Sequence, residues 1–357
     1  MCEVDTVKEP IDSRLLALAA ENETTFKLVK LGISKPCSVP DITSNFDHLA
    51  YLAVFRHVAR LEVLDAKVKE SSGDFAGAYQ NYFDTFKLGQ AVATNGVLIN
   101  GLVGIAIDTI ALRAMWPTID SLSETQLQVV MGELEVASNN AVSYAAVMKQ
   151  ENQVMSFMME KFSQRGYAYD VMWAMADRSK FPLIEAPRAI AGNLVWLYFI
   201  VMQHSNMAAM QEYLVKDEQF ATAPYESIQE RETLAYLEGD SSPIKANVYL
   251  NITAPALLRA KDAFKRRDAY YRGTYLKVAR AWYNKSHSKL TNLEQLVEAG
   301  IIKSVPIDPF SGQPFKLVDG KIYSIGHDRK DDLAELNVFE KSEGGKNNPA
   351  NYGDMVF

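Results

Sequence analysis

The stretch that decides the fold is residues 47–116, DHLAYLAVFRHVARLEVLDAKVKESSGDFAGAYQNYFDTFKLGQAVATNGVLINGLVGIAIDTIALRAMW. It predicts three consecutive helices packed on one another. Apolar residues recur three and four positions apart over 51–68 and again, after Gly73, over 75–88, and this spacing places each set on one helical face. Residues 97–116 are apolar almost all round, which predicts a helix buried on most sides.

More helices are expected on both sides of this stretch. Ser123 and Gln126 form the pattern of a capping box before an apolar run, which predicts a helix start. Gly101 and Gly104 fall inside the apolar helix and suggest a close approach of a neighbouring helix. The further expected helices span 14–22, 24–31, 123–137, 140–162, 189–216 and 225–238.

Length and composition bound the class of protein. A chain of 357 residues exceeds the roughly 250–300 at which one core stops growing, so two domains are expected. A hydrophobic fraction of 48% and a charged fraction of 23% are those of a globular protein. A net charge of −7 argues against nucleic acid, which requires a basic footprint. The two cysteines, Cys2 and Cys37, form no CxxC motif; a bridge between them and two free thiols are both open.

The compartment is not fixed by the start of the chain. The first residues lack the basic and apolar regions of a signal peptide. Either the protein is cytoplasmic, or an export segment has been removed. No membrane span is predicted, because the strongest candidate, residues 189–202, is shorter than the roughly 20 residues required and contains Asn193.

The pattern changes after the turn-rich segment 239–243. A long charged helix is expected over 255–285, with an aromatic stripe at Phe264, Tyr271, Tyr275 and Trp282 and a basic opposite face. Two alternating runs around Asp319-Gly320 predict a β-hairpin. The fold class is therefore mainly α: an all-α multi-helix module over 12–240, followed by a smaller α+β domain with a short antiparallel sheet over 254–357.

This last domain resembles the globular part of the type II secretion major pseudopilins. The resemblance is carried by a long helix ending in Ala281-Trp-Tyr283, the string Ile307-Asp-Pro-Phe-Ser-Gly-Gln-Pro-Phe315, a hairpin, the run 323–332 and the closing 353–356. The hairpin over 61–86, with Ser71-Ser-Gly-Asp74 at its turn, and the apolar run 102–112 carry a second resemblance. With them, the whole chain resembles uncharacterised exported proteins of planctomycete-type bacteria, in which a helical module precedes this tail. Both resemblances imply an exported protein of the periplasm or cell surface.

The pseudopilin resemblance also implies a calcium site. The acids that match the family's loop are Asp328, Asp331, Asp332 and Asp354. Hard oxygen ligands in a Gly-hinged loop suit calcium, and a bound ion would stiffen a small domain. A solvated acidic loop, with neighbouring basic residues that offset its charge, remains the alternative.

Other candidate chemistry is sparse. Asp108 lies within an apolar helix and is expected to have a buried partner in Arg113, Arg60 or another helix; a catalytic acid is the alternative. The aromatic-rich segment 163–190, with Tyr167, Tyr169 and Trp173, is either a cleft lining or a loop pinned by its rings. The acids that could pair for sugar hydrolysis are Glu133, Glu135, Glu151 and Glu160. The histidines show no metal-binding spacing; they are His48, His57, His204, His287 and His327.

The absence of any P-loop, GxSxG or GxGxxG string favours a non-catalytic function. We expect an exported binding or scaffold protein of the cell envelope, with a protein or glycan partner and a tail stabilised by calcium. The alternative is a helical hydrolase of glycans with a cleft near 163–190, and a third reading is an intracellular helical adaptor. A deep pocket with two convergent carboxylates of perturbed pKa would favour the enzyme, and a shallow aromatic groove would favour binding.

Overall fold

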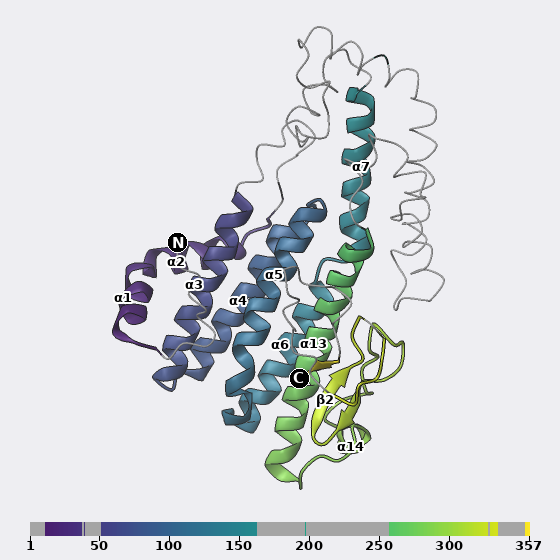
Figure 1. Ribbon diagram of the computed structural model, residues 1–357. Helices are drawn as coiled ribbons and strands as arrows, with labels where there is room; N and C mark the ends of the chain where they lie inside the picture. The colour runs from purple at the N-terminus through teal and green to yellow at the C-terminus, as the bar shows by residue number, and fades with distance from the viewer. Residues whose placement is uncertain are drawn as a thin grey trace, which may run out of the picture.

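A computed structural model describes residues 11–37, 39, 51–162, 197, 257–327, 329–334 and 354–357. Within these ranges the protein is mainly helical, with a small antiparallel sheet near its carboxyl end (Figure 1). This confirms the predicted fold class. The expected helices over 189–216 and 225–238 lie outside the described residues.

The amino-terminal helices form an antiparallel stack. Helices α1 (Ser13–Glu21) and α2 (Glu23–Ile33) lie outside the hairpin of α3 (Tyr51–Ser71) and α4 (Phe75–Ala93). The turn between α3 and α4 uses Gly73 at φ 83° and Asp74, whose side chain accepts a hydrogen bond from the Gly77 amide at 2.9 Å. Glycine suits the left-handed position after a helix, and aspartate suits the cap of the next helix.

The central helix of the bundle is α5 (Leu98–Met115). A Cβ added at Gly104 would lie 2.7 Å from the Gly89 carbonyl oxygen of α4, so glycine permits this close helix contact, as predicted. By length and composition alone, the stretch Leu98–Ser121 could cross a membrane, but 67% of its most apolar window is buried inside the protein. The core helix of a globular fold has the same properties.

Three elements follow α5. The 3-10 helix η2 (Trp116–Ser121) contains Pro117 in its first turn. Helix α6 (Glu124–Asn140) begins at the predicted capping box, in which the Ser123 hydroxyl and the Gln126 amide group each satisfy the other's backbone N–H. Helix α7 (Tyr144–Phe162) then extends beyond the end of the bundle.

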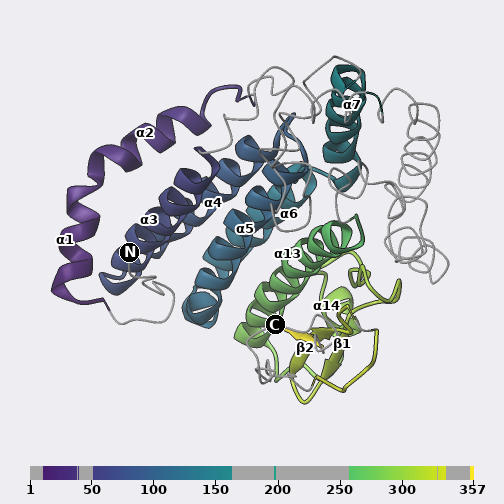
Figure 2. The same cartoon turned by 45° about the horizontal axis from the view of Figure 1, so that its top comes forward.

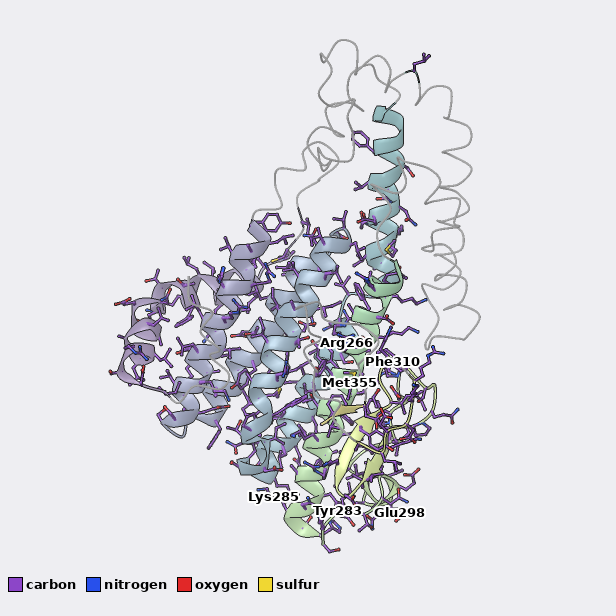
Figure 3. The ribbon with its side chains drawn as sticks, in the orientation of Figure 1. Arg266, Tyr283, Lys285, Glu298, Phe310 and Met355 are labelled. Carbon is purple, nitrogen blue, oxygen red and sulfur yellow. The ribbon has the colours of Figure 1, made fainter. Side chains whose placement is uncertain are left out.

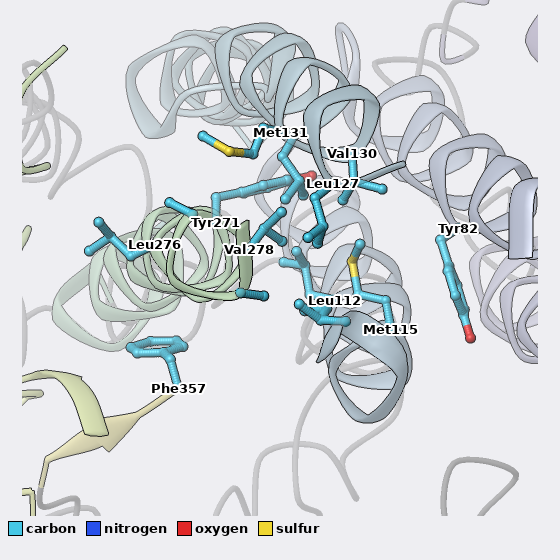
Figure 4. Close-up of a cluster of buried hydrophobic side chains, with 14 of the residues drawn as sticks. Tyr82, Leu112, Met115, Leu127, Val130, Met131, Tyr271, Leu276, Val278 and Phe357 are labelled. Carbon is cyan, nitrogen blue, oxygen red and sulfur yellow. The ribbon is translucent and has the colours of Figure 1, made fainter. Parts of the chain in front are cut away.

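Helix α13 (Leu257–Ser286) connects the bundle to the sheet. Figure 2 shows it between α5 and α6 on one side and the strands and α14 (Glu294–Glu298) on the other. In Figure 4, Tyr271 points from α13 toward α6, whereas Phe357 packs on the opposite side of α13. One hydrophobic cluster therefore runs from α4 through α13 to the sheet.

The sheet has the order β1-β2-β3, with β1 (Lys316–Val318), β2 (Lys321–Ser324) and β3 (Met355–Val356) all antiparallel. The predicted hairpin is confirmed: Val318 pairs with Lys321 around Asp319 and Gly320, which have φ 51° and 76°. Phe310 and Met355 lie on the sheet side of α13 (Figure 3).

The string around Asp308 joins the loop to the hairpin. The buried Asp308 carboxylate accepts hydrogen bonds from the Ser324 hydroxyl at 2.7 Å and the Phe310 amide at 3.1 Å. Because two backbone segments meet at one carboxylate, this aspartate has a structural role. The proposed division at 240–254 falls in residues outside the described ranges, and it stays a prediction.

Candidate functional site

A large groove lies where α6, α13 and the segment after α14 meet. Its volume is about 1060 Å³, and residues 128–139, 271–282 and 297–306 contribute to its lining. A cavity of this size is at the upper end of the ~300–1,000 Å³ typical of ligand sites. The groove spans the junction between the helical bundle and the carboxyl-terminal part.

Aromatic side chains of α13 form the floor of the groove. Tyr271 is buried, whereas Tyr275 and Trp282 are half-buried. These residues belong to the stripe that the sequence singled out, because spacings of four and seven return to the same helical face. The indole Nε1–H of Trp282 donates to the Glu124 carboxylate at 2.9 Å, which fixes the ring at the end of the groove.

One wall is an exposed stripe of α6. Gln128, Gly132, Glu135 and Asn139 recur at spacings of four, three and four, so they share one face of the helix. All four are exposed. No atom lies within 4 Å of a Cβ added at Gly132, which leaves the middle of this wall open.

The other wall is the turn that follows α14. Gly300 has φ 69°, and the Ile301 amide donates to the Leu296 carbonyl at 3.0 Å, the arrangement of a glycine-ended helix. The Arg272 guanidinium of α13 donates to the Ile307 carbonyl at 2.5 Å. This charged hydrogen bond holds the wall against the floor and places the exposed Lys303 and Ser304 at the rim.

The groove contains one carboxylate among its described lining residues, Glu135. Partial burial raises the pKa of the Tyr275 phenol, and the negative charge of Glu135 adds to that effect. A neutral phenol can both donate and accept a hydrogen bond. The groove thus offers aromatic surface, hydrogen-bonding groups and separated single charges.

Asp108 does not lie in the groove. It is buried at the contact of α5 with α13, and desolvation raises the pKa of its carboxyl to about 7, against the opposing effects of the Arg267 charge and the Tyr271 hydroxyl. Its charge partner therefore comes from another helix, which was one of the expected alternatives. Arg113 is exposed and contributes none of the causes of this shift.

Glu62 is a second buried acid that sequence reasoning missed. It lies between α3 and α4, where desolvation and then the charges of Asp84 and Asp65 raise its pKa to about 7. Neither carboxylate oxygen has a hydrogen-bond partner within the described part of the chain. In the sequence, Glu62 is a charged residue of an amphipathic helix, three positions before Asp65. Nothing in this local pattern indicates that its side chain is buried.

One acid of the predicted calcium loop, Asp354, is buried and suits a metal ligand. Asp354 is 4% exposed; its Oδ2 accepts the Ala334 amide at 2.8 Å, and its Oδ1 has no partner among the residues described. Burial raises the pKa of this carboxyl to about 6, with a contribution from the charges of Asp331 and Asp332. A buried carboxylate oxygen without a partner fits a metal ligand.

The other predicted ligands are arranged differently. Asp331 forms an ion pair with Lys316 and accepts the Tyr323 hydroxyl at 2.9 Å, so both of its oxygens are engaged. The half-buried Asp332 lies beside Asp354, and Asp328 lies outside the described residues. Within the described ranges, no three acidic, histidine or cysteine side chains gather closely enough to hold a metal ion. The calcium site stays a prediction that Asp354 favours.

The remaining candidate acids with described side chains lie in different parts of the fold. Glu151 of α7 accepts the Leu98 amide at 2.8 Å and caps α5, and burial raises its pKa. Glu133 is exposed on the opposite side of α6 from the groove, beside a second cavity of about 350 Å³. Nothing is described for the side chain of Glu160. The aromatic cleft near 163–190, with Tyr167, Tyr169 and Trp173, lies outside the described residues.

The histidines and the basic face of α13 differ in part from expectation. His57 is exposed, and His287 stacks on Tyr283 at 4.4 Å between ring centroids. The Nδ1 atom of His327 instead lies 2.7 Å from the carboxylate of Asp262, a contact that the sequence did not indicate. The predicted basic face was wrong for Lys261, Lys265 and Arg267, which are buried, because the aliphatic stems of such side chains pack well against rings. His48 and His204 lie outside the described ranges.

Cys37 carries a free, exposed thiol, and Cys2 lies outside the described residues.

Comparisons of the chain with protein-family models, with curated proteins and with solved structures found no match. The groove and its residues therefore carry the functional inference.

Proposed function

We propose that the protein is a non-catalytic binding or scaffold protein of the cell envelope, exported from the cytoplasm, which holds its partner in the groove between α6, α13 and α14. The observation that carries this proposal is the lining of the groove: half-buried aromatic rings beside exposed amides and a single carboxylate, Glu135. Aromatic side chains with polar neighbours bind ligands without requiring an acid–base pair. The order of motifs in the tail supports export.

The alternative function, hydrolysis of glycans, requires two carboxyl groups on opposite sides of a scissile bond. The described acids with a strongly raised pKa, Glu62, Asp108 and Asp354, are buried and do not line the groove. Because these carboxyl groups do not face the groove, they lend no support to catalysis there. The cleft first considered for this activity lies outside the described ranges.

The test is co-sedimentation of the full-length chain with envelopes from the cells that produce it. The wild-type protein should sediment with the envelopes, and Trp282→Ala should weaken this binding by about 30-fold, as expected when a large aromatic contact is removed from an interface. The control is Val136→Ala, an exposed apolar residue of α6 outside the groove lining.

Equal sedimentation of Trp282→Ala and the wild-type protein, with both variants folded by circular dichroism, would overturn the assignment of the groove. Release of reducing sugar ends from the envelopes would contradict the non-catalytic proposal and support the hydrolase.

A further inference from the structure

We infer that the ligand of the groove is an uncharged glycan several sugar units long. This inference rests on the proposed function and names the partner class for the same groove. It follows from three properties of the groove: the aromatic floor, the composition of the rim and the balance of charge.

The floor matches the apolar faces of sugar rings. Tyr275 and Trp282 are seven residues apart on α13 and expose part of each ring to the groove. Seven residues correspond to two helical turns, or about 10.5 Å along the helix. Two ring platforms at that separation can contact two different units of one sugar chain, since aromatic rings combine apolar faces with polar edges.

The rim matches sugar hydroxyls. Gln128, Ser138 and Asn139 project from α6, and Ser304 lies on the facing turn. Amides and hydroxyls provide donors and acceptors together, and a sugar hydroxyl needs both when it leaves water. An apolar peptide segment would bury these groups without hydrogen-bond partners, which is unfavourable.

The charges of the groove favour an uncharged ligand. Glu135 and Lys303 lie on opposite walls, and the Arg272 guanidinium is engaged with the Ile307 carbonyl at 2.5 Å. No cluster of cations is present among the described lining residues to receive an anionic polymer. A net charge of −7 over the chain adds a general repulsion of such polymers.

The experiment measures binding of the full-length protein to three preparations of envelope: untreated, digested with protease, and oxidised with periodate, which cleaves the vicinal diols of sugars. Binding should survive protease and should be lost after periodate. If binding is lost after protease digestion but survives periodate oxidation, the partner is a protein. That result would overturn the glycan inference and leave the proposed function intact. Absence of binding to untreated envelopes would overturn both.

A matched pair of variants ties the result to the groove. Asn139→Ala removes an amide from the rim, whereas Asn140→Ala removes the neighbouring exposed amide outside the groove lining. Loss of one hydrogen bond should weaken binding to protease-treated envelopes by about 2- to 12-fold for Asn139→Ala only. Equal affinity of the two variants would contradict the inference even where the periodate result agrees.

Discussion

At the level of single residues, the buried acids dominate the electrostatics of the helical bundle. Burial raises the pKa of Glu62 and of Asp108 to about 7. Each carboxyl holds its proton in the folded state at a pH at which the unfolded chain has released it. The folded state therefore binds more protons, and the free energy of unfolding falls as pH rises from about 4 to about 7.

The change Glu62→Gln should remove the contribution of this residue. A neutral amide resembles the protonated acid and does not titrate. The free energy of unfolding should therefore fall less in the variant than in the wild-type protein between pH 5 and pH 8, and the difference between the two falls should be up to about 3 kcal/mol. The measurement is urea unfolding at both pH values. Glu133→Gln, on the exposed face of α6, is the control. An unchanged pH dependence in Glu62→Gln would show that Glu62 is ionised in the folded protein.

Single residues also mark the limit of sequence reasoning. The aromatic stripe of α13 was predicted from its spacing, because helical periodicity is local. The depth of Glu62, the pairing of His327 with Asp262 and the burial of Lys261 were missed. Each depends on a helix or loop distant in the chain, and no spacing within one segment reports such a neighbour.

At the level of helices and strands, two glycines in helix interiors have opposite roles. A Cβ at Gly104 would lie 2.7 Å from the Gly89 carbonyl oxygen, whereas a Cβ at Gly132 meets no atom within 4 Å. Gly104→Ala should therefore destabilise the protein by about 1–3 kcal/mol through overpacking. Gly132→Ala should stabilise it by about 0.5–1 kcal/mol through helix propensity. Thermal unfolding of both variants tests this, and the same sign for both would refute the close contact of α4 with α5.

The acidic loop yields a prediction about calcium. If Asp354 contributes to a metal site, added calcium should raise the melting temperature and a chelator should reverse the rise, because an ion that binds only the folded state stabilises it. Asp354→Asn should abolish the response. Asp319→Asn is the control, since asparagine tolerates the left-handed conformation of this turn. A melting temperature insensitive to calcium and chelator would remove the site and leave the solvated loop.

Most elements were predictable because their signals are local. The capping box at Ser123, the hairpin at Asp319-Gly320 and the amphipathic periods of α3 and α4 all lie within a few turns of chain. The groove was not predicted. It forms because α13 brings α6 together with a turn more than 150 residues later in the chain. No local sequence pattern shows which distant segment will face α6.

At the level of the entire protein, α13 makes the bundle and the sheet depend on each other. The Phe357 ring lies 5.6 Å from Trp116, 5.9 Å from Tyr270 and 6.0 Å from Phe315, measured between centroids. These partners belong to η2, to α13 and to the segment that precedes β1. A single ring thus joins the described parts across the helix they share.

Phe357→Ala should destabilise both parts together, by about 3–5 kcal/mol. Hydrogen exchange should show lost protection in α5 and in β2, not in β2 alone. Leu31→Ala, an exposed residue of α2, should leave both unchanged. Loss confined to the sheet would show that the two parts unfold independently.

Hydroxyl-radical footprinting of the full-length chain, with and without protease-treated envelope fragments, tests most directly whether the partner occupies the groove. Bound fragments should protect Tyr275 and Trp282 from oxidation and leave the exposed His57 of α3 unchanged. Binding of the fragments with undiminished oxidation of Tyr275 and Trp282 would place the partner elsewhere and contradict the proposed role of the groove.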